Sequence, residues 1–158
     1  MPEYSIDFAQ EMSKASNAIV ANGIESTDAQ RATLYIGLVA CEIAIKAALE
    51  CAGMPISKIK ACGHNLSVLL DYLSKCTVLD ESQTRVSAVR IRASVVDNNY
   101  IDATIGKLLD GEYIGASQFP NQIRYGDELL NHFPAHVIAK LSEKVVAWVK
   151  LHMDEIKV

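Results

Sequence analysis

Helix-breaking residues are scarce in this chain, which has 8 glycines and 4 prolines among 158 residues. Long elements are therefore expected, rather than many short ones joined by turns. The chain also lacks any run of 18 apolar residues, so no segment is predicted to span a membrane. The first residues are acidic and contain no unbroken apolar core, unlike a signal peptide. The sequence thus predicts a soluble, cytoplasmic protein.

An excess of positive charge is absent as well. The formal net charge is -4, which argues against a protein that coats nucleic acid by bulk electrostatics and leaves room only for a local basic groove. The four cysteines follow no secretory signal and show no framework spacing, so reduced thiols are expected. Cys62-x-His64 lacks the paired ligands of a zinc site, and no metal or other cofactor is expected.

What the chain does contain is helical periodicity over nearly its whole length. It is long enough for one domain, residues 1–158, with a hydrophobic core. We expect an all-α, up-and-down bundle of about five principal helices, over 5–21, 27–52, 65–73, 81–109 and from Pro134 onward. Asp97-Asn98-Asn99 interrupts the fourth pattern and is expected to kink or break that helix.

The second predicted helix is apolar on most sides, which places it at the centre of the bundle. Its cap is expected at Thr27 or Asp28. The first helix is expected to point Ile6, Ala9, Met12 and Ile19 inward. The last helix is expected to expose Val146, Trp148 and Val149 together, and this apolar patch favours a homodimer.

Residues 31–73 contain two segments with a distinctive pattern, Leu34-Tyr35-x-x-Leu38-Val39-x-x-Glu42-x-x-x-Lys46-Ala47-x-Leu49 and, after Gly53, Gly63-His64-Asn65-Leu66-x-x-Leu69-Leu70. In these segments the chain resembles the HEPN domains, small prokaryotic helical bundles. Asn121-x-x-Arg124-Tyr125 is similar to an element that some members carry before the last helix. The resemblance implies an HEPN-like bundle and a homodimer. It also implies a role in a toxin–antitoxin or defence pair or beside a nucleotidyltransferase, with RNA or a nucleotide as further ligands.

Many HEPN domains are metal-independent ribonucleases whose signature is an arginine with a histidine four to six residues further on. This chain lacks that signature, because Arg124 and His132 have seven residues between them. The prediction is therefore a non-catalytic binding module. The alternatives are a diverged ribonuclease that uses Arg124 with His132 or His64, and a purely structural oligomer.

The Gly63-His64-Asn65 turn begins a predicted helix, so either His64 or Asn65 is expected to cap it rather than to catalyse. Glu42 has two interpretations. It forms an i,i+4 ion pair with Lys46, or it contacts Arg124 or Arg31, since a charge inside an apolar helix needs a partner.

The remaining candidates are surface features. Asn121, Arg124 and Tyr125 form the expected ligand or partner site with Glu42, because long loops in compact domains are often functional. Arg85 and Arg92 are expected on one helix face, where they would bind phosphate or face solvent. His132 and His136 are separated by Pro134, which spoils a metal-binding pair.

Overall fold

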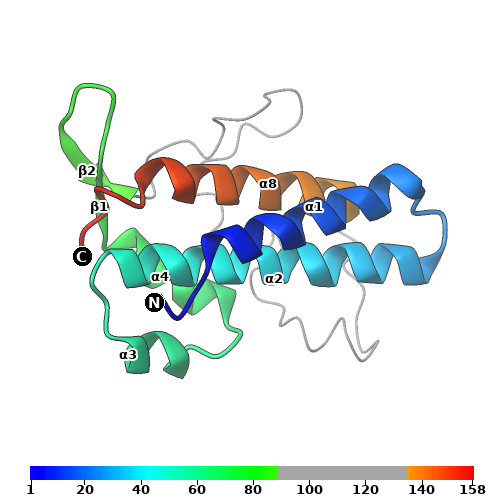
Figure 1. The fold of residues 1–158 in the computed structure, drawn as a ribbon, viewed down its shortest axis with the longest axis horizontal. Helices are drawn as coiled ribbons and strands as arrows, with labels where there is room; N and C mark the ends of the chain where they lie inside the picture. The colour runs from blue at the N-terminus through cyan, green and yellow to red at the C-terminus, as the bar shows by residue number, and fades with distance from the viewer. Residues whose placement is uncertain (89–134) are drawn as a thin grey trace.

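The structure, a computed structural model, describes residues 1–88 and 135–158. These residues form five helices and one two-stranded antiparallel sheet, so the all-α fold class is confirmed (Figure 1). The elements are α1 (Ile6–Asn22), α2 (Thr27–Cys51), α3 (Ile56–Ala61), α4 (Leu66–Ser74), β1 (Thr77–Leu79), β2 (Arg85–Ser87) and α8 (Ala135–His152).

Polar side chains start three of these helices at the places where the sequence turns from loop to periodic pattern. Ser5 Oγ accepts the Phe8 amide N–H of α1, and Ser26 Oγ accepts that of Ala29 in α2. The third cap is Asn65, at the start of α4. The cap of α2 is thus Ser26, one residue before the predicted Thr27. Such caps satisfy amides that have no partner inside the helix.

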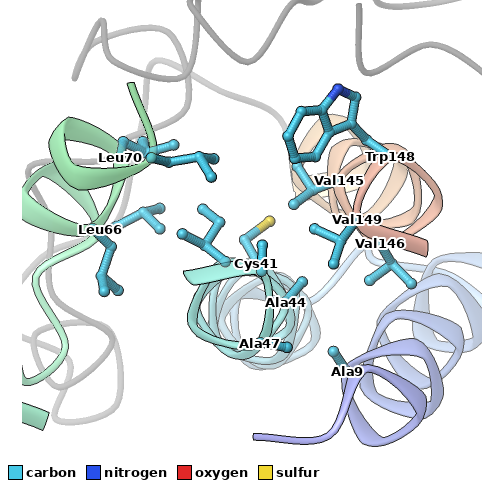
Figure 2. Close-up of a cluster of buried hydrophobic side chains, with 14 of the residues drawn as sticks. Ala9, Cys41, Ala44, Ala47, Leu66, Leu70, Val145, Val146, Trp148 and Val149 are labelled. Carbon is cyan, nitrogen blue, oxygen red and sulfur yellow. The ribbon is translucent and has the colours of Figure 1, made fainter. Parts of the chain in front are cut away.

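The central position predicted for the second helix is correct. Figure 2 shows α2 between Leu66 and Leu70 of α4 on one side and Val145 and Val149 of α8 on the other. Alanines and cysteine on α2 let its neighbours approach closely, and the large side chains of α4 and α8 fill the space between them. Burial of each such leucine or valine contributes about 1.5–3 kcal/mol.

The buried face of α1 differs from the prediction in its second half. Ile6 and Ala9 are buried as expected, whereas the line continues through Ser13 and Ser16 instead of Met12. Ser13 Oγ lies 2.8 Å from Ser142 Oγ on α8, and Ser16 Oγ donates to the Thr33 carbonyl on α2. Small hydroxyl side chains fit here because the three helices pack closely and each hydroxyl finds an acceptor.

The start of the predicted helix 81–109 is wrong, because residues 85–87 form β2 and pair with β1. The turn between the strands is held by Asp80, whose carboxylate accepts the amides of Ser82 and Thr84. Gln83 there has a φ of 61°, which no helix allows. The rest of that helix, including the break predicted at 97–99, lies outside the described residues.

The last helix starts where it was predicted, but its apolar patch does not face solvent. Val146, Trp148 and Val149 are all buried, so this basis for a homodimer is wrong. Helix α2 is long and apolar enough by composition to cross a membrane, but its apolar residues are buried by the neighbouring helices. In its most apolar window 72% of the residues are buried inside the protein, the pattern of a core helix.

Candidate functional site

A cluster of charged side chains lies at the edge of the core, where α2 passes the turn between α3 and α4. Glu42 Oε1 accepts a hydrogen bond from Lys46 Nζ at 2.8 Å. The two carboxylate oxygens of Glu42 also lie 3.1 and 3.2 Å from His64 Nδ1. We call Glu42, Lys46 and His64 the charged cluster.

Two local features of the sequence build this cluster. Glu42 and Lys46 are one helical turn apart on α2, so their side chains meet on one face. Gly63, at a φ of 57°, turns the chain after α3, a conformation that costs glycine little. Asn65 then caps α4 through the Val68 amide, which leaves the preceding His64 directed at α2.

Burial differs sharply across the charged cluster. The side chains of Glu42 and Lys46 are 6% and 9% exposed, whereas that of His64 is 53% exposed. A buried carboxylate is tolerated only with partners, which Lys46 and His64 supply. Because a carboxylate only accepts, the proton sits on Nδ1 of His64, and Nε2 is the ring nitrogen left for a ligand.

Neighbouring groups limit what chemistry this arrangement supports. Burial raises the pKa of the Cys62 thiol, while Lys46 and Lys58 partly oppose that shift. The thiol therefore stays protonated at neutral pH and is a poor nucleophile. Lys46 Nζ also lies 5.4 Å from the centroid of the Tyr4 ring, within cation–π range. The cluster is thus equipped to bind or to accept a proton, and the neighbouring thiol is not activated as a nucleophile.

The structure brings some of the predicted site residues together. The ion pair predicted between Glu42 and Lys46 is confirmed. Asn65 is the cap of α4, and His64 pairs with Glu42 instead of capping. The contact predicted between Glu42 and Arg31 is wrong, since α2 carries them about three turns apart and Arg31 pairs with Asp28.

Arg85 lies away from the charged cluster, on β2. Its guanidinium donates to the carbonyls of Thr77 at 3.1 Å and Glu155 at 2.7 Å, which ties the sheet to the chain after α8. The prediction that Arg85 shares a helix face with Arg92 is wrong, because Arg85 lies in a strand.

Several candidates lie outside the described residues, namely Arg92, Asn121, Arg124, Tyr125 and His132. His136 lies in the first turn of α8. Within residues 1–88 and 135–158, no three His, Cys, Asp or Glu side chains gather as metal ligands.

Two features were missed by reasoning from the sequence. Tyr4 and Glu50 join residues before α1 to α2 beside the charged cluster, and no periodicity signals that contact. A groove of about 520 Å³ lies between α1 and α8, over Val146, Ala147 and Leu151. The polar residues of α1 that line this groove repeat at helical spacing. That spacing alone does not predict a groove, because it does not tell which helix packs beside α1.

Comparison of the chain with models of known protein families, with curated proteins and with solved structures finds no match.

Proposed function

We propose that this chain is a non-catalytic, HEPN-like interaction module. Its partner is a nucleotidyltransferase or another member of a toxin–antitoxin or defence pair. The observation that carries the proposal is the charged cluster. The two sequence segments that resemble HEPN domains, around Glu42-x-x-x-Lys46 and around Gly63-His64-Asn65, meet through one carboxylate.

The chemistry of the cluster favours binding over catalysis. Glu42 is already engaged by both neighbours, so its carboxylate serves to hold Lys46 and His64 in place. The half-exposed imidazole then presents one fixed nitrogen to a partner, with little loss of rotamer freedom on binding. A protonated Cys62 offers no covalent route.

The proposal is tested by purifying the tagged protein from its own cells, beside a His64→Ala variant. We expect a nucleotidyltransferase, or a nucleic acid, to co-purify with the wild-type chain in defined proportion and to be lost from the variant. Lys14→Ala is a matched control, since that side chain is exposed and belongs to α1. Equal recovery with all three proteins would contradict a partner site at His64.

A metal-independent ribonuclease is the second candidate, and one observation favours it. A carboxylate that holds a half-exposed histidine through Nδ1 is the arrangement that general-base catalysis uses. Cleavage of mixed cellular RNA in EDTA, lost in both His64→Ala and Arg124→Ala, would support this activity. The interaction module predicts no cleavage by the folded wild-type protein.

A further inference from the structure

The residues before α1 lie as a separate strap on the face of α2 that carries the charged cluster. We call residues 1–4 the N-terminal strap. Glu50 Oε1 accepts the amide N–H of Glu3 and Oε2 accepts that of Tyr4, each at 2.9 Å. Lys60 Nζ on α3 lies 2.7 Å from the carboxylate of Glu3.

The contacts of the strap resemble those of a bound peptide more than those of a structural element. Its amides are held by a side-chain carboxylate instead of a strand ladder or helix. Helix α1 does not depend on it, because Ser5 caps the helix through Phe8. The strap is therefore removable without loss of a regular element.

Each part of the strap meets a group suited to recognise it. The Glu50 carboxylate binds the main chain by accepting charge-assisted hydrogen bonds from two successive amides. Lys60 forms an ion pair with the acidic side chain of Glu3, and Lys46 lies over the ring of Tyr4. The Tyr4 ring is partly buried against the core, as aromatic anchors at interfaces are.

The strap is also held weakly enough to be exchanged. The side chains of Lys60 and Glu3 are 57% and 46% exposed, and exposed ion pairs contribute little. Its advantage over a competing segment is that it is tethered, which gives it an effective concentration in the millimolar range. A partner segment with the same chemistry then competes for the same groups.

We infer that Lys46, Glu50 and Lys60 form a binding site for a short acidic–aromatic peptide that bends at these two residues, as the strap does at Glu3 and Tyr4. The chain's own Glu3-Tyr4 occupies this site in the free protein, and a Glu-Tyr segment of a partner protein replaces it. This inference rests on the proposed function, to which it adds the chemistry of the partner, and Lys46 is common to this site and the charged cluster.

The test measures binding of a fluorescein-labelled, acetylated Pro-Glu-Tyr-Ser amide to the full chain by anisotropy. A Glu3→Ala, Tyr4→Ala double variant, the opened chain, loses the side-chain contacts of the strap and keeps only its two amides as competitors for Glu50. We expect it to bind the peptide about tenfold more tightly than the wild type. A Pro-Gln-Leu-Ser peptide is the matched control and should bind neither protein. Circular dichroism checks that the helices are intact.

Two variants within the opened chain identify the site. Glu50→Gln should weaken peptide binding about tenfold, and Lys60→Ala, at an exposed position where folding is safe, should weaken it about threefold. Peptide binding that is equal in wild-type and opened chains, or indifferent to both variants, would overturn the inference. A wild-type dimer that Tyr4→Ala dissociates would instead assign the site to a second copy of this chain and also overturn it.

Failure here is distinguishable from failure of the proposed function. If the peptide does not bind but a partner still depends on His64, the interaction module stands and only its peptide specificity is lost.

Discussion

The buried ion pair between Glu42 and Lys46 allows the attraction between the two charges to be separated from the free-energy cost of burying them. The amine and carboxylate are 2.8 Å apart and both side chains are at least nine-tenths buried. Removing one partner of such a pair typically costs about 3–5 kcal/mol, because the other charge stays buried without compensation. Lys46→Met should fall near the lower end, about 3 kcal/mol, since His64 still contacts the carboxylate.

Replacing both charges gives the contrasting result. Glu42→Leu with Lys46→Met fills the same space with apolar side chains and should lie within about 1 kcal/mol of the wild type, or above it. The free energies of unfolding come from urea denaturation followed by circular dichroism, with m-values compared to verify two-state behaviour.

The double-mutant cycle then reports the coupling between the two residues. His64→Ala is the control and should cost less than about 1 kcal/mol, because the ring is half exposed and Glu42 keeps Lys46. The reasoning would be refuted if Lys46→Met cost under about 1 kcal/mol and the double variant cost the sum of the single ones.

Three further predictions concern packing, caps and pH. Gly37→Ala should destabilise by about 1–2 kcal/mol in urea denaturation despite better helix propensity, because a new Cβ would lie 3.1 Å from Ile138 Cγ2 and 3.2 Å from Ser16 Oγ. Ser26→Ala should cost about 1 kcal/mol by removing the cap of α2, measured in the same way. Burial raises the pKa of Cys41 to about 12 from its ordinary 9.0, so the thiol stays protonated to a higher pH in the folded state than in the unfolded state. This stabilisation is complete below pH 9 and is lost as the pH rises toward 12, by up to about 4 kcal/mol relative to Cys41→Ala.

The helices were predictable where local signals agree with the packing. Apolar spacing on α2 and Pro134 before α8 both act within a few residues of the element they predict. The β1–β2 turn was missed because Val86 and its neighbours repeat at a spacing that fits a helix as well as a strand. There the Asp80 turn, which satisfies two amides, decides the structure.

The site shows the same division between local and distant contacts. Spacing alone predicts that Glu42 meets Lys46, since both lie on one helix. It cannot predict that His64, 22 residues later, completes the cluster, because that contact depends on how α4 docks. Ser13 and Ser16 were missed for a related reason: hydropathy favours Met12 and Ile19 inward, whereas close helix packing favours small side chains.

The face of α2 at Glu42, Lys46 and Glu50 joins these observations. Residues four apart on a helix share a face, so one stripe serves the charged cluster and the strap in succession. Lys46 contacts a carboxylate on one side and an aromatic ring on the other. An apolar helix in the centre of a bundle does not require three charged residues at four-residue spacing for stability, since apolar residues would pack there at least as well. Their presence is better explained by what they hold at the surface, the imidazole of His64 and the amides of residues 3 and 4.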